Sequence, residues 1–372
     1  MFKSYKVNID KNHRPYVKLT FTANADTTVD VYFTKESFDS ETPDDTISLA
    51  ANQEKTTTYN RENIYIFKFA DPTTIISTKI NGALLNCFKL FYECYNLISL
   101  DVINFDTSKV TNMNSMFSIG LPWMDGKLTT LDVSNINTSN VTDMSNMFNG
   151  CSKLINLNVS HFDTSNVTDM SNMFRGCSEL TTLDVSHFDT SNVTNMVSMF
   201  ENCSGLTTLD VTNFDTSNVT DMSLMFGNCS GLTTLDVTNF DTSNVTDMSN
   251  MFQFCSSLVS LDITNFNTLN VTSMRWIIGY CSSLTSLDVT NFDTSKVSNM
   301  SNMFVNCEAL TSLDLSNFNI AEVTNMNEMF VNCSNLTTIG PVDTAPGWQH
   351  KPDEYHDMFI NCPATPKPSW YK

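Results

Sequence analysis

Cysteine recurs every 26 residues through most of the chain, and this interval constrains the fold more than any other feature. Each cysteine stands at the same place in a nearly constant stretch, which reads LTTLDVTNFDTSNVTDMSLMFGNCSG at residues 206–231. Periods of this length are typical of arrays in which each repeat stacks on the previous one. The sequence therefore predicts a solenoid. The cysteines of the series are Cys151, Cys177, Cys203, Cys229, Cys255, Cys281, Cys307 and Cys333.

The element L-x-x-L-D-V occurs about ten times, from Leu97 to a degenerate copy that begins at Leu336. Its Leu, Leu and Val residues are expected to face the core while polar residues face solvent, which is the pattern of a strand. The later segment S-N-M-F-x-x-C is expected to form one helical turn with its serine as N-cap. We therefore expect a mainly β repeat protein with about ten 26-residue coils.

Residues 1–78 lack the repeat and are expected to form a small antiparallel β-domain that attaches the array. Alternating apolar and polar residues predict strands at 17–21, 29–33 and 64–69, and a weaker one at 47–49. The solenoid spans residues 79–362, with caps at 79–96 and 341–362, because an uncapped array exposes apolar side chains at its ends. The first cap is predicted to contain a short helix over residues 81–94. A Pro-rich tail follows at 363–372.

The net charge is −20, and residues 128–340 hold 21 acidic but only four basic side chains. An acidic surface repels phosphate backbones and anionic lipids, so nucleic acid and membrane surfaces are not expected as partners. The sequence shows no signal peptide, transmembrane segment or wall anchor. Together with the retained Met1, this favours a chain that does not use the general secretory route.

The repeat resembles that of the BspA-like leucine-rich-repeat surface proteins, with the pattern L-x-x-L-D-V-x-x-F-D-T-S-x-V-T-x-M-S-x-M-F-x-x-C-S over residues 84–362. The resemblance implies a leucine-rich-repeat-like right-handed solenoid. Members of that family are mostly bacterial cell-surface proteins implicated in adhesion, and similar repeats occur in phage-encoded proteins. Because export and anchoring signals are not seen, the resemblance points to a phage-encoded member, located in a virion or at a cell surface.

The repeated cysteines and methionines are interpreted as core residues rather than as a metal or haem site. No C-x-x-C spacing suggests zinc, and thiols stacked in register point in parallel, which disfavours disulfides. The methionines accompany an inward phenylalanine in each repeat, as expected of packing. Free thiols in this number suit a reducing environment. Apart from bound calcium, discussed next, no cofactor or metal is expected.

The aspartates of L-D-V are expected to line one exposed face. Carboxylates stacked about 4.8 Å apart repel one another, and neighbouring hydroxyl groups or a bound cation such as calcium could relieve this repulsion. No calcium-loop motif is present, so a plain solvated face and a binding face both remain open. A second aspartate column, which precedes Thr-Ser, is interpreted as Asx turns. The candidate binding residues of the first column are Asp184, Asp210, Asp236, Asp262 and Asp288.

The repeat is interrupted most clearly at residues 274–281, which read MRWIIGYC where the preceding repeat reads MSNMFQFC. Arg275 and Trp276 replace small polar residues, and Tyr280 precedes the cysteine. Because Arg, Trp and Tyr are frequent anchors of interfaces, these three are candidate contact residues, together with Trp123 in an inserted loop. Drift of one repeat explains the same changes equally well.

Catalysis finds no support, because no nucleophile elbow, phosphate loop or metal triad is present. We expect a non-enzymatic recognition or adhesion protein whose solenoid, displayed by the N-terminal domain, binds protein or glycan on a cell surface. The preferred setting is a phage virion, as a fibre or decoration, with the N-terminal domain contacting other virion or surface subunits. The alternatives are a purely structural virion or surface component and a bacterial cell-surface adhesin. No membrane insertion is expected.

Overall fold

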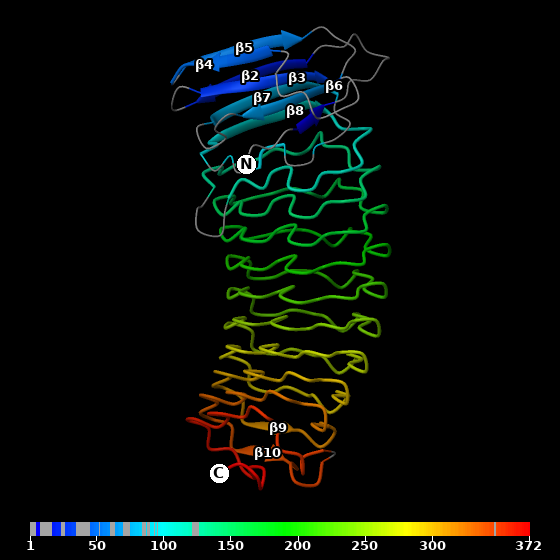
Figure 1. The fold of residues 1–372 in the computed structure, drawn as a ribbon, viewed down its shortest axis with the longest axis vertical. Coiled ribbons are helices and arrows are strands. Elements are labelled where there is room, and N and C mark those ends of the chain that lie inside the picture. The colour runs from blue at the N-terminus through cyan, green and yellow to red at the C-terminus, as the bar shows by residue number, and fades with distance from the viewer. Residues whose placement is uncertain are drawn as a thin grey trace. The chain divides into compact units, whose positions relative to one another are not determined.

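The computed structural model describes residues 5–7, 17–23, 27–34, 45–51, 53–59, 64–69, 75–83, 87, 90–92, 94, 96–120, 126–345 and 347–372. The chain forms two compact units, Met1–Leu183 and Asp184–Lys372, and each is described by itself. Figure 1 shows the N-terminal strands as arrows, and the repeats within each unit as successive layers of turns.

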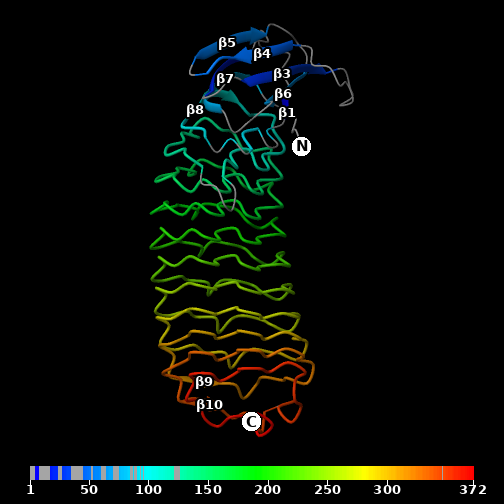
Figure 2. The same cartoon turned by 60° about the vertical axis from the view of Figure 1, so that its left-hand side comes forward.

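The N-terminal strands form two four-stranded sheets (Figures 1 and 2), with strand orders β1-β6-β3-β4 and β5-β2-β7-β8. All pairs are antiparallel except β7 with β8. The strands predicted at 17–21, 29–33, 47–49 and 64–69 are confirmed as β2, β3, β4 and β6. The bounds are β1 Tyr5–Val7, β2 Val17–Ala23, β3 Thr27–Thr34, β4 Asp45–Leu49, β5 Glu54–Tyr59, β6 Ile64–Phe69, β7 Ile75–Ala83 and β8 Ser99–Asp106.

Strand β7 joins the N-terminal sheet to the first repeat. It pairs in parallel with β8, which contains the first L-D-V of the array, and Ala83 lies opposite Asp106. Residues 81–83, for which the sequence predicts a helix, are therefore strand. The reason is the sheet edge: β8 would otherwise present unpaired backbone groups, and β7 satisfies them. Strand β7 also crosses residue 78, where the sequence places the end of the N-terminal domain.

The repeats contain little regular strand. Among the described repeats of the second unit, only β9 (Ser312–Asp314) and β10 (Thr338–Gly340) form a short parallel pair. Elsewhere, equivalent residues 26 apart meet in isolated parallel bridges, such as Asp221 with Asp247. The chain is thus a repeat protein, but the strand expected at every L-x-x-L-D-V is mostly not formed, since each repeat turns too often to build a ladder.

The helical turn expected at S-x-M-F-x-x-C is also not formed. In residues 222–229, Leu224 and Asn228 have φ angles of 59° and 60°. An α-helix requires a φ near −60°, so two left-handed residues within one such segment end any helix there. The segment instead makes consecutive turns that return the chain to the next Leu-x-x-Leu.

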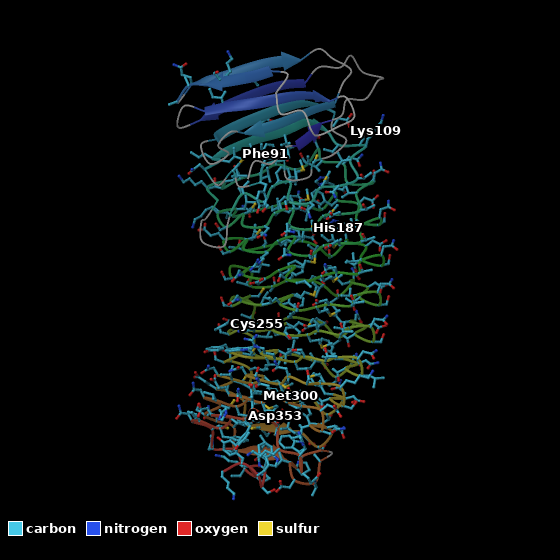
Figure 3. The ribbon with its side chains drawn as sticks, in the orientation of Figure 1. Phe91, Lys109, His187, Cys255, Met300 and Asp353 are labelled. Carbon is cyan, nitrogen blue, oxygen red and sulfur yellow. The ribbon has the colours of Figure 1, made fainter. Side chains whose placement is uncertain are left out.

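The core of each repeat consists of the leucine, valine, phenylalanine, methionine and cysteine columns. In the second unit, Met222, Met225, Phe226 and Cys229 are fully buried. The phenylalanine rings stack from repeat to repeat, with Phe226 and Phe252 centroids 5.8 Å apart and planes 6° from parallel. All described cysteines are buried, so their interpretation as core residues is confirmed. Figure 3 draws these side chains, with sulfur in yellow.

Backbone and side-chain hydrogen bonds both tie successive repeats together. The backbone N–H groups of Leu224 and Phe226 donate to the carbonyls of Ser249 and Met251, each at 2.9 Å. The Asn218 side-chain amide donates a hydrogen bond to the Ser191 carbonyl at 2.8 Å, and Asn244 does the same to Ser217 at 2.7 Å. The Thr216 hydroxyl donates to the backbone carbonyl of Asp241 at 2.9 Å. These bonds satisfy backbone groups that regular strands would satisfy in a sheet.

The C-terminal segment covers the end of the last repeat. Trp348 is fully buried and its Nε1 donates to the Phe318 carbonyl at 3.0 Å. Phe359 stacks on Phe330 at 5.2 Å, and the Tyr371 ring meets Phe359 edge-on at 5.0 Å. The tail that contains Tyr371 is therefore part of this cap. In the portion of the chain that the structure describes, no helix has the length and apolarity needed to cross a membrane.

Candidate functional site

The L-D-V aspartates from Asp132 onward are exposed, as predicted, and each one shapes a turn. Asp210 Oδ1 accepts hydrogen bonds from the backbone N–H and the hydroxyl of Thr212, at 3.1 and 2.7 Å. Asp236 and Thr238 repeat this arrangement at 3.0 and 2.6 Å. This is the Asx turn that the sequence assigns only to the second aspartate column. The first column therefore has a structural role in addition to its exposure.

The same hydrogen bonds control the charge of the column. The hydroxyl of Thr212, followed by its N–H, lowers the pKa of Asp210 below the usual aspartate value, while the carboxylates of Asp184 and Asp236 oppose this shift. The pKa values of Asp184, Asp236, Asp262 and Asp288 are lowered by the equivalent bonds. The column is consequently ionised at neutral pH.

Three of these aspartates line an open hollow of about 550 Å³ in the second unit. Asp210, Asp236 and Asp262 contribute carboxylates, and Thr208, Thr234 and Ser260 contribute hydroxyls. Among the described residues, no group of three or more His, Cys, Asp or Glu side chains is arranged to hold a metal ion. Calcium binding by the L-D-V aspartates therefore stays a prediction that no such ligand set supports.

A second candidate surface lies at the interrupted repeat. The rings of Phe254 and Tyr280 stack at a centroid distance of 4.2 Å, and Trp276 stacks on Tyr280 at 5.7 Å with planes only 5° apart. All three side chains are half-buried, and the adjacent Arg275 is exposed. We call these four residues the aromatic surface. The structure thus brings together Trp276 and Tyr280 and adds Phe254, with Arg275 as the chain neighbour of Trp276. Trp123 lies outside the described residues.

The backbone under the three rings is left-handed, with φ angles of 59° at Phe254, 59° at Trp276 and 64° at Tyr280. A residue with a side chain pays about 1 kcal/mol for this conformation, and glycine and asparagine are the usual occupants. The Tyr280 column elsewhere holds these residue types, except at Phe254: Gly150, Gly176, Asn202, Asn228, Asn306 and Asn332. The Trp276 column is more varied, with Asn146, Asn172, Asn250 and Asn302 but also Ser198, Leu224 and Glu328. Aromatic rings are therefore presented where the backbone does not favour them.

The surroundings of Trp276 are adapted to its ring. A Cβ atom on Gly279 would lie 2.9 Å from Trp276 Cε3, so glycine leaves the space that the indole occupies. The equivalent positions in the adjacent repeats hold Gln253 and Val305. The indole Nε1 is buried without a hydrogen-bond partner, an unusual state for tryptophan. The structure therefore leaves room for the indole ring, but the indole N–H makes no hydrogen bond.

The repeat that carries this surface, residues 258–283, also differs in charge. Asp262 is its only acidic residue and Arg275 its only basic one, whereas residues 206–231 contain three aspartates and no basic residue. Between residues 184 and 340 the only other Lys or Arg is Lys296, whose Nζ donates to Asn270 Oδ1 in this repeat at 2.9 Å. Val259 and Leu269, also in this repeat, are 52% and 46% exposed. Residues 258–283 are therefore neutral and partly apolar within an acidic array.

Sequence reasoning finds one part of this picture and misses two. The break in the repeat identifies Arg275, Trp276 and Tyr280. It misses Phe254, which lies in the preceding repeat. The signal was present, because Phe254 and Tyr280 both stand one residue before the repeated cysteine. It also misses the Asx turn formed by the aspartate of L-D-V, which is indicated by a Ser or Thr two residues after that aspartate.

Comparison with known protein families gives one match, which recurs along the array. A family described as "Mycoplasma protein of unknown function, DUF285" matches residues 83–121, 123–234, 196–304, 225–340 and 253–365. These overlapping matches cover well over half of the chain, as expected for a repeat family. No curated protein and no solved structure gives a significant match. The chain therefore belongs to the DUF285 family.

Proposed function

We propose that the chain is a non-enzymatic, surface-exposed recognition protein. Its repeats would form a leucine-rich-repeat-like right-handed solenoid of about ten coils, displayed by the N-terminal strands. The observation that carries the proposal is the aromatic surface: three rings held at strained backbone positions, beside an exposed arginine, in the one neutral repeat of an acidic stretch.

The side chains, rather than the backbone, distinguish this site, because the same two columns are left-handed in the other repeats of the array as well. Tryptophan, tyrosine and arginine are the residue types that most often dominate binding energy. Two asparagines at positions 276 and 280 would suit the backbone better, so stability alone does not account for the rings.

The chemistry of the described side chains also supports a binding role over a catalytic one. Burial raises the pKa of the Cys255 thiol to about 12, so this thiol stays protonated and is a poor nucleophile. The exposed aspartates of the L-D-V column have lowered pKa values, whereas a carboxyl that acts as a general acid near neutral pH needs a raised one.

Two settings are proposed for this function. Display on a cell surface is supported by the resemblance of the repeats to those of the BspA-like surface proteins. A phage virion is the other proposed setting, because repeats similar to those of the BspA-like proteins occur in phage-encoded proteins. Detection of the chain with an antibody in purified particles or in isolated cell envelopes distinguishes the two.

The test of recognition is binding of the purified full chain to a panel of intact cells. The matched control is a reverted variant, Phe254→Asn, Arg275→Ser, Trp276→Asn and Tyr280→Asn, in which each new residue is one that the same column carries in other repeats. We expect saturable binding by the natural chain and a loss of at least about tenfold in affinity for the variant. Absence of saturable binding to every cell type would instead indicate a structural spacer.

A further inference from the structure

We propose that the aromatic surface is the centre of a protein-binding site, and that its partner presents an apolar centre surrounded by basic side chains. This inference deepens the proposed function and rests on it. It is carried by the contrast between the neutral repeat 258–283 and its acidic neighbours, together with the way the rings are stacked.

The centre of the site has the composition of an interface core. Two aspartate columns change here, to Asn267 and Ser273, and only Asp262 remains. Carboxylates enclosed by a partner are costly to desolvate, so their absence favours contact at this repeat. Aromatic residues and arginine, which interface cores favour, are gained in the same repeat.

The rim of the site has the opposite character. One repeat is only about 4.8 Å thick if adjacent repeats are spaced as strands are, whereas a stable protein contact covers about 800 Å² on each side. A protein seated on Trp276 therefore also covers parts of the neighbouring repeats, residues 232–257 and 284–309. Of the acidic residues there, Asp247 lies beside this surface, because it forms a parallel bridge with Ser273, two residues before Arg275. Glu308 follows Cys307, which is equivalent to the Cys281 that adjoins Tyr280. Charge complementarity then requires basic side chains around the apolar centre of the partner.

The stacking favours a protein over a sugar. Tyr280 is stacked with Phe254 and with Trp276, so its ring faces are engaged within the chain. A sugar ring needs an open aromatic face, whereas aliphatic side chains and guanidinium groups can also pack along ring edges. Because the Trp276 Nε1 has no hydrogen-bond partner, a small rotation of the indole toward a partner loses no hydrogen bond.

The same charges argue against a second copy of this chain as the occupant. Two copies that meet at repeat 258–283 would also bring their acidic neighbouring repeats together, and like charges in register repel. A neutral centre relieves this repulsion only at the point of contact. A basic partner is attracted by the whole rim.

The experiment selects peptides from a displayed random library on the immobilised full chain, with the reverted variant as counter-selection. The reverted variant keeps every acidic residue, so peptides that bind by charge alone are removed. We expect enriched peptides with an aromatic or aliphatic centre and flanking Lys or Arg. Their affinity should fall at least about tenfold on the reverted variant and decrease with rising salt concentration.

A second variant tests whether replacing any left-handed residue of this column affects binding, or only Trp276. Leu224 occupies the Trp276 column two repeats earlier, with a φ of 59°. Leu224→Asn should leave peptide affinity unchanged. The inference is overturned by enriched peptides that are acidic, by peptides that bind the reverted variant equally well, or by cell binding that periodate abolishes and protease treatment of the cells does not. Saturable cell binding together with a failed selection would leave the proposed function standing and remove this inference alone.

Discussion

The thiol sulfur of Cys229 lies 3.1 Å from the carbonyl oxygen of Phe200, to which it donates a hydrogen bond between adjacent repeats. Cys255 and Cys281 make the same contact with Phe226 and Phe252, at 3.2 Å in both cases. Each thiol thus fills the core and adds a second hydrogen bond to a buried carbonyl, since Phe200 O also accepts from the Cys203 N–H at 3.1 Å. Alanine or valine at this position could not make the inter-repeat bond.

These buried thiols predict a loss of stability at alkaline pH. The ordinary thiol pKa of 9.0 applies in the unfolded chain, whereas burial raises the pKa of Cys255 to about 12 in the fold. The stabilisation is therefore complete below pH 9.0 and is lost as the pH rises toward 12. Urea unfolding of the natural chain and of Cys255→Ala across this range should show a shallower decline for the variant. Rapid alkylation of the native chain at pH 8 would contradict the prediction, because it requires accessible thiolates.

The Asx turn predicts that amide and methyl replacements of one aspartate differ. Asp236→Asn keeps an Oδ1 acceptor for Thr238, as Asn158 does naturally for the Ser160 N–H at 3.0 Å. Asp236→Ala loses both bonds and should lower the free energy of unfolding by about 1 kcal/mol, against little change for Asp236→Asn. Chemical denaturation measures both. Equal effects of the two variants would show that charge, rather than turn geometry, is what the column requires.

The lowered aspartate pKa values predict acid sensitivity. Hydrogen bonds from Ser or Thr lower the pKa of Asp184, Asp210 and Asp288 in the fold relative to the ordinary 3.8. A lowered folded pKa stabilises the fold above the unfolded value, so this contribution is present at pH 5 and is lost as the pH falls below 3.8. Thermal unfolding followed across this range should show a falling midpoint. Asp210→Asn should reduce the steepness, and an unchanged slope would argue against the assignment.

The space over Gly279 predicts a coupling with Trp276. Gly279→Ala places a methyl group 2.9 Å from the indole and should cost about 1–3 kcal/mol of stability through overpacking. In the background Trp276→Asn the same change should cost much less, because the ring is gone. Urea unfolding of the two single variants and the double variant gives this difference. Additive effects would mean that the indole does not occupy the position described.

The tail predicts a role in closing the array. The Trp370 Nε1 donates to the Trp348 carbonyl at 2.7 Å, and Tyr371 covers Phe359. Removal of residues 369–372 should expose these rings and promote self-association, seen as a rise in mass by light scattering. The conservative variant Tyr371→Phe keeps the ring and should remain like the natural chain. A monomeric truncated chain of unchanged stability would show that the tail is dispensable.

The sequence was informative where a pattern is local. Alternation identifies β2 and β6, and the fixed interval identifies the repeat and its buried columns. It misled at residues 81–83, where the parallel pairing with β8 overrides a helical pattern. It also suggested a helical turn before each cysteine, since nothing in single-residue propensities reveals the left-handed backbone at Leu224 and Asn228. The recurrence of Asn and Gly in those two columns is the sequence feature that indicates a left-handed backbone there.

The candidate site was predicted by its departures from the repeat, and only in part. A changed residue is visible in one line of sequence, but a stack between Phe254 and Tyr280 requires that two repeats be aligned in space. The hydrogen-bond state of the Trp276 Nε1 and the space over Gly279 depend on the packed structure and have no signature in the sequence.

The ties between repeats have a consequence for how such chains change over time. Each asparagine bonds to the backbone one period earlier, as Asn244 does to Ser217, and needs nothing from more distant repeats. Duplication or loss of a whole 26-residue segment by recombination therefore restores every bond at the new junction. Copy number can drift without refolding the remainder, and a distinctive repeat such as 258–283 can be carried nearer to or farther from the N-terminal strands.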